Sequence, residues 1–149
     1  MNEEKWIDFG EVGVDSGQLI ICDPCYIKDE WENEELIDKP ETIIFPDGHT
    51  EKVKRCSKRW FELVEDINNG KLKNKEEPFE KPKNNFSYPA CCEATREKQY
   101  GQLNYKIGHA GVGVAFSSGL GDGVYKVQGK IEDVEGYGER VTEVRIKLI

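Results

Sequence analysis

The sequence has no apolar run that approaches the roughly 18 residues needed to span a membrane. Its first residues, MNEEKWIDFG, also lack the basic start and the apolar stretch of a signal peptide. We therefore expect a cytoplasmic protein with no membrane partner. In that compartment the five cysteines, an odd number, are expected to be mostly free thiols and not a disulfide framework.

Positive charge is also scarce, because 21 Lys and Arg residues are outnumbered by 29 Asp and Glu, for a net charge of -8. Proteins that bind the backbone of nucleic acids need clustered cations, so a nucleic-acid polymer is not an expected partner. The charge is uneven: residues 1–51 contain three Lys or Arg and fifteen Asp or Glu, whereas residues 52–83 contain ten and six. The acidic part could contact a protein, and the basic part could contact an anion.

The chain of 149 residues fits a single domain. Alternating or continuous apolar runs predict strands at 11–14, 19–22, 42–45, 51–55, 102–107, 110–116, 123–131 and 141–149. Short turns between neighbouring strands predict an antiparallel meander, with hairpins at 11–22, across the PDGH turn at 46–49 and across the SSGLGDG turn at 117–123. The expected fold class is α+β, with a predominantly antiparallel bent sheet or partial barrel and one main helix.

That helix is predicted at 57–69, where Ser57 is a suitable N-cap and Gly70 a suitable C-terminal cap. Its predicted apolar face consists of Trp60, Phe61, Val64 and Ile67. We expect it to pack on the glycine-bearing face of strand 110–116, where a bare backbone leaves room for a helix, a ring or a ligand. Residues 71–85 are rich in Lys, Glu, Asn and Pro, which predicts a flexible connection.

Thiol chemistry is a first candidate activity. A cysteine nucleophile needs an imidazole base, and a third group that fixes the tautomer of that base. Cys25 or Cys92 is the candidate nucleophile and His109 the candidate base, and the orienting groups considered are Asp23, Glu93 and Asp122. The alternative is that these cysteines are small buried side chains and His109 is an ordinary loop residue.

No metal cofactor is assigned, although a divalent metal is an alternative. Carboxylates at strand ends could supply oxygen ligands for Mg²⁺ or Ca²⁺; these are Asp15, Asp23, Glu93 and Asp122. Turn capping explains each aspartate equally well. A zinc site built from CDPC at 22–25 and CC at 91–92 is disfavoured, because the second pair is adjacent and not spaced as C-x-x-C.

The glycine-rich turn within SSGLGDGVY, at 117–125, is followed by a strand and has no Walker lysine, so it lacks the context of a dinucleotide or P-loop site. Successive backbone N–H groups at Gly121, Asp122 and Gly123 could still bind an anion. The turn is therefore either purely structural or also a ligand contact.

Three segments, VDSGQLIICDPCY at 14–26, SYPACCEAT at 87–95 and GHAGVGVAFSSGLGDGVYKV at 108–127, resemble an uncharacterised domain family of small bacterial and bacteriophage proteins. In that family, DSG-L-DPCY, CEAT and G-x-GDG-x-Y segments recur in this order, and no reaction is assigned. The resemblance covers the two ends of the chain. It points to Asp15, Ser16, Gly17, Asp23, Pro24, Cys25, Tyr26, Cys92, Glu93, Thr95, Gly119, Gly121, Asp122, Gly123 and Tyr125.

The favoured function is a module that binds a small anionic ligand, such as a nucleotide-derived signal, through backbone N–H groups, aromatic faces and cations. The candidate ligand-binding residues are Asp23, Tyr26, Arg55, Arg59, Glu93, Gly121, Asp122, Gly123 and Tyr125. A bacteriophage protein that sequesters a host signal nucleotide would fit, by analogy. The alternatives are a hydrolase or transferase that uses the Cys–His pair or a divalent metal, and a protein-interaction domain. Homo-oligomerisation stays open.

Overall fold

A computed structural model describes residues 6–75 and 79–149 and contains nine strands and three helices. The strands are β1 (Ile7–Val14), β2 (Gln18–Cys22), β3 (Glu41–Ile44), β4 (Thr50–Val53), β5 (Lys73–Lys75), β6 (Tyr100–Asn104), β7 (Ala110–Ser117), β8 (Gly123–Val134) and β9 (Gly138–Ile146). The helices are α1 (Pro24–Asp29), α2 (Lys58–Asn68) and α3 (Tyr88–Thr95). Neighbouring strands pair antiparallel. The predicted α+β class is therefore confirmed.

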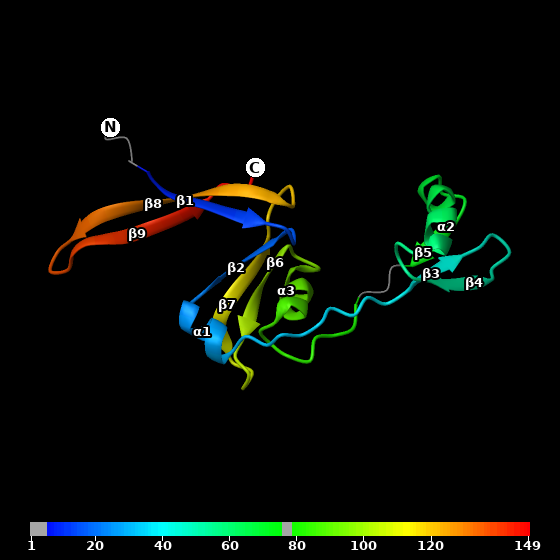
Figure 1. Ribbon diagram of the computed structural model, residues 1–149, viewed down its shortest axis with the longest axis horizontal. Coiled ribbons are helices and arrows are strands. Elements are labelled where there is room, and N and C mark those ends of the chain that lie inside the picture. The colour runs from blue at the N-terminus through cyan, green and yellow to red at the C-terminus, as the bar shows by residue number, and fades with distance from the viewer. Residues whose placement is uncertain (1–5, 76–78) are drawn as a thin grey trace.

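The strands form three open sheets, ordered β1-β8-β9, β2-β7-β6 and β4-β3-β5. The first two sheets, α1 and α3 lie together and are called the main module. The third sheet and α2, called the small module, are joined to it by two extended segments (Figure 1). Within the predicted flexible connection at 71–85, residues 73–75 form β5, and residues 76–78 lie outside the described residues. Its flexibility stays a prediction.

The predicted helix is confirmed as α2. The Ser57 side chain accepts a hydrogen bond from the Trp60 N–H at 3.2 Å, and Gly70 beyond the helix has φ +72°. The predicted apolar face was partly wrong, because Leu63 is the buried residue of the helix while Phe61 is 61% exposed. The small-module core consists of Ile43, Val53, Leu63 and Leu72. Helix α2 therefore covers β3 and β4. The prediction that it packs on strand 110–116, which is β7, was wrong.

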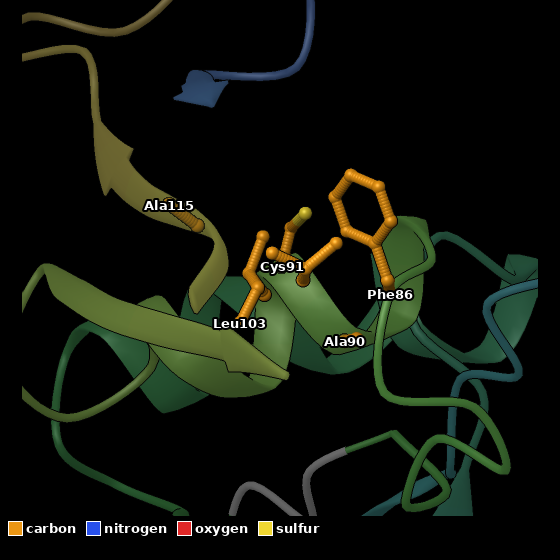
Figure 2. Packing of buried hydrophobic residues seen from close by; sticks show 6 residues of the cluster. Phe86, Ala90, Cys91, Leu103 and Ala115 are labelled. Carbon is orange, nitrogen blue, oxygen red and sulfur yellow. The ribbon is translucent and has the colours of Figure 1, made fainter. Parts of the chain in front are cut away.

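Helix α3, which the sequence did not predict, packs on the β2-β7-β6 sheet instead. Figure 2 shows its side chains meeting those of β6 and β7 in the main-module core, which consists of Phe86, Ala90, Cys91, Leu103, Val112 and Ala115. A Cβ atom on Gly101 of β6 would lie 2.5 Å from the Ala94 carbonyl oxygen. A glycine is therefore required where the helix approaches the strand.

Two of the predicted hairpins, at 11–22 and across the 117–123 turn, were wrong, whereas the hairpin across the PDGH turn is confirmed by the antiparallel pairing of β3 with β4. β1 pairs with β8 and β2 pairs with β7, so neither β1–β2 nor β7–β8 is a paired unit. The pairs Val14–Gly123 and Gln18–Ser117 lie on either side of the two turns. One segment therefore consists of β1 and β2 and the other of β7 and β8, and the two run antiparallel. Both bend at the two turns, a place called the corner, where they pass from the β2-β7-β6 sheet into the β1-β8-β9 sheet.

Candidate functional site

Hydrogen bonds between the two turns hold the corner together. A carboxylate oxygen of Asp122 accepts the Gly17 N–H at 2.8 Å, and the Ser118 N–H donates to the Gly17 carbonyl at 2.9 Å. The Tyr125 hydroxyl donates to the carbonyls of Ser118 (2.7 Å) and Gly121 (2.6 Å). Two candidate ligand contacts, Asp122 and Tyr125, thus have structural partners, and any role in ligand binding stays a prediction.

Asp122→Ala is expected to lower the free energy of unfolding by about 1 kcal/mol, because the variant loses the acceptor for the Gly17 N–H. Asp122→Asn should lose less, since its amide oxygen can accept the same bond. Urea unfolding of both variants measures the difference. Asp15→Ala, at an exposed position in the adjacent turn, is the matched control. An equal loss in that control would contradict a specific role for the Asp122 bond.

A polar cluster, called the Cys92 cluster, lies where α3 meets this corner. The Gln18 side-chain N–H donates to Cys92 Sγ at 3.5 Å. Burial raises the pKa of Tyr88, and so do Cys92 and, more weakly, Asp122. The Gln18 amide oxygen is buried and has no hydrogen-bond partner within the described chain. The cluster therefore combines two predicted residues with Gln18 and Tyr88, which the sequence analysis missed.

A second cluster, called the Tyr105 cluster, lies at the other end of β2. Asp23 caps α1 by accepting the Cys25 N–H at 2.9 Å. The Tyr105 ring packs edge-on against Tyr26 at 5.1 Å and lies 4.4 Å from His109, between ring centroids. The hydrogen bond with Tyr26 is the main cause that raises the pKa of Tyr105 to about 12. Tyr105, which sequence reasoning passed over as an ordinary strand residue, thus connects several predicted site residues.

The geometry gives little support to a Cys–His catalytic pair. Cys92 contacts Gln18, the first residue of β2. His109 precedes Ala110 in the β6–β7 hairpin, beside the other end of β2 at Cys22. Gln18 and Cys22 are four residues apart, which in a strand is about 13 Å. Cys25 precedes Tyr26, which contacts Tyr105 in the same cluster as His109, but the hydrogen bond with Asp23 raises the pKa of the Cys25 thiol. A raised pKa disfavours the thiolate needed for nucleophilic attack.

The remaining predicted residues are dispersed. Arg55 pairs with Glu41 at 2.8 Å, and Arg59 pairs with Glu51 at 2.9 Å, both on the small module. One carboxylate oxygen of Glu93 accepts from Arg96 at 3.2 Å, and its other oxygen is buried without a partner in the described chain. Across residues 6–75 and 79–149, no group of three or more His, Cys, Asp and Glu side chains is arranged to hold a metal ion.

An open cavity of about 220 Å³ lies between the segments that join the two modules. Its lining consists of Glu34, Glu35, Ile37, Glu80, Lys81, Lys83 and Pro89. None of the predicted site residues belongs to it. Its mixed charges do not match a site for a small anion.

One face of the β1-β8-β9 sheet is apolar, and it was not predicted as a site from the sequence. The strand register aligns Gly129 with Ile7 and Val144, and Ile131 with Val141. The Phe9 ring lies on this side, because it is 2.3 Å from the position that a Gly129 Cβ would take. The face, called the apolar sheet face, consists of Ile7, Phe9, Val127, Ile131, Val141, Val144 and Ile146.

Charged side chains are concentrated on the opposite face of this sheet. Lys130 pairs with Glu143 at 2.7 Å, and Arg145 donates to Gln128 at 2.9 Å. The Trp6 ring lies 3.8 Å from the Arg145 guanidinium carbon, in a cation–π arrangement. The sheet is therefore amphipathic, with alternate residues directed to opposite sides.

The apolar sheet face is open to water. The exposed fractions are 38% for Ile7, 41% for Phe9, 43% for Ile131, 55% for Val141 and 60% for Val144. In Figure 1 the β8–β9 hairpin projects away from the helices, and no helix of the described residues covers it. A contiguous apolar patch of this kind marks an interaction surface more often than single exposed apolar residues do.

No known protein family, curated protein or solved structure matches this chain. The resemblance carried by the three sequence segments therefore stays a prediction. None of the helices within the described ranges has the length and apolar character needed to cross a bilayer.

Proposed function

We propose that this protein is a protein-binding module and that the apolar sheet face is its contact surface. The observation that carries the proposal is that five apolar side chains lie together on one side of one sheet and are each at least 38% exposed. Covering such a surface removes apolar area from water, which favours association by roughly 25 cal/mol per Å².

Two features favour this function over the small anionic ligand predicted from the sequence. The cations considered for that ligand, Arg55 and Arg59, are engaged by Glu41 and Glu51. The candidate ligand contact at Asp122 already accepts a backbone N–H. The anionic-ligand function stays a prediction, and the protein-interaction alternative gains a specific surface. That surface differs from the acidic N-terminal part considered in the sequence analysis.

Site-specific photo-crosslinking in the cells that produce the protein tests the proposal. A benzoylphenylalanine at Val141, on the apolar sheet face, should give discrete protein adducts. The same group at Lys126, which lies on the opposite face of β8, should not. A second substitution, Val144→Lys, should remove the Val141 adducts, because it places a charge in the contact surface. Equal adducts from both faces, or none from Val141, would contradict the proposal.

A further inference from the structure

We infer that the partner covers the apolar sheet face with an amphipathic helix of about three turns that has a basic residue at one end. This inference rests on the proposed function and specifies the chemistry of the partner. It commits to a helix from another protein, and the alternative of a second copy of this chain is separated from it by the experiment below.

The first support comes from the other two sheets of the same chain. Helix α3 covers the β2-β7-β6 sheet through residues such as Ala90 and Cys91, and α2 covers β3 and β4 through Leu63. Each of these three-stranded sheets thus has one apolar face on which a helix packs. The β1-β8-β9 sheet has an equivalent apolar face and no such helix in the described chain.

The dimensions of the face also fit one helix. Three strands spaced about 4.8 Å apart make a surface about 14 Å wide, and the five residues from Val127 to Ile131 extend about 17 Å. An α-helix is about 10–12 Å across with its side chains, and about 11 residues reach 17 Å. Helix α2, which covers the equivalent face of the small module, has 11 residues. A partner helix would present apolar residues at i, i+3, i+4 and i+7.

Charge at the outer end of the face specifies the rest of the partner. In the strand register Asp133 lies opposite Glu139, two residues beyond the Ile131–Val141 pair. The two carboxylates therefore lie on the same side of the sheet as the apolar residues. Both are exposed. A Lys or Arg at the matching end of the helix would be attracted to them. A second copy of the chain would instead bring a second acidic pair and another net charge of -8, which opposes self-association.

Titration of the ¹⁵N-labelled full chain with synthetic stapled helices, followed by amide chemical shifts, tests this inference. The first probe is an amphipathic helix with a leucine stripe and two lysines at one end. The second has glutamates in place of the lysines, and the third has the composition of the first in scrambled order. We expect the first probe to shift amides of 127–131 and 141–146, and to bind about fivefold more tightly than the second at low salt. High salt should reduce that difference.

Val144→Lys should weaken binding of the lysine-ended helix at least tenfold, because it places a charge within the apolar contact. Lys126→Ala, on the opposite face, is the matched control and should bind as the wild type does. Equal binding of the scrambled helix, or shifts confined to residues outside β1, β8 and β9, would overturn the inference.

Sedimentation equilibrium of the wild-type chain and of Val144→Lys separates the two proposals. A concentration-dependent dimer that Val144→Lys abolishes would replace the helix with a second copy, and the proposed function would stand. Specific crosslinks at Val141 without helix binding would likewise overturn only the helix. Loss of both the crosslinks and the helix binding would overturn the proposed function as well.

Discussion

Phe86→Ala is expected to lower the free energy of unfolding by about 3–5 kcal/mol. Phe86 is 1% exposed and packs edge-on against Trp31, with ring centroids 5.0 Å apart and an interplanar angle of 86°. Alanine would leave a cavity among Ala90, Cys91 and Leu103, the neighbours of Phe86 in the main-module core. Since globular domains are typically stable by only about 5–15 kcal/mol, this is a large part of the total.

Urea unfolding followed by far-UV circular dichroism measures the loss. Phe61→Ala is the matched control, because Phe61 is 61% exposed on α2 and its removal should cost within about 0.5 kcal/mol. If the two modules unfold separately, Phe86→Ala should move only the transition of the main module. An equal loss in both variants would contradict the assignment of Phe86 to the central packing of that module.

The strands could be predicted from the sequence because their signal is local. In VTEVRIKLI, alternation alone places Val144 and Ile146 on one side and Arg145 on the other, and the structure has this arrangement. Helix α2 was predicted for the same reason, since its cap, its apolar spacing and its terminal glycine all lie within 14 residues of each other.

The strand pairing could not be predicted in the same way. The turns at Asp15–Gly17 and Ser118–Asp122 both have the composition of hairpin turns. The sequence of a turn does not show whether the two strands that it joins pair with each other or with other strands. They part because two distant segments bend together, and the Gly17–Asp122 bond spans 105 residues. Helix α3 was not predicted because most residues of YPACCEAT are apolar or small on every side of the helix. The segment therefore lacks the periodic change between apolar and polar residues that indicates a helix.

The apolar sheet face could be predicted from the sequence only in part. The alternation that directs Val141 and Val144 to one side was visible in the sequence, but alternation cannot show whether that side is covered. Their exposure follows from the fold, in which α2 and α3 are used on the other two sheets. The contact of Gln18 with Cys92 depends on packing between β2 and α3, which lie 74 residues apart.

Glu34→Ala is expected to lower the free energy of unfolding by about 2–3 kcal/mol, the scale of hydrogen bonds to a charged group. Its carboxylate accepts the Lys83 N–H at 2.6 Å, the Asn84 N–H at 3.2 Å and the Ser87 hydroxyl at 2.9 Å. Ser87 is fully buried and caps α3 by accepting the Ala90 N–H. One carboxylate therefore joins the two connecting segments to the start of the helix that covers the main sheet.

The stabilisation should also depend on pH. Burial alone would raise the pKa of Glu34, but hydrogen bonds from Lys83, Ser87 and Asn84 outweigh it and lower this pKa below the ordinary value of 4.5. A carboxyl group with a lowered pKa in the folded state stabilises the protein above its unfolded-state pKa. The contribution of Glu34 should therefore be complete at neutral pH, and be lost as the pH falls below about 4.5 through the folded-state pKa.

Unfolding free energies of the wild type and Glu34→Gln, measured from pH 7 to pH 3, isolate this contribution. The pKa values of Asp23, Asp47 and Glu51 are also lowered by hydrogen bonds, so the variant will keep part of the wild-type slope. The difference between the two curves is the Glu34 contribution, and it should shrink toward low pH, because a protonated carboxyl and an amide each offer a single strong acceptor. Glu35→Gln, at the exposed neighbouring position, should follow the wild type. A constant difference across the whole range would mean that Glu34 acts through packing and not through its charge.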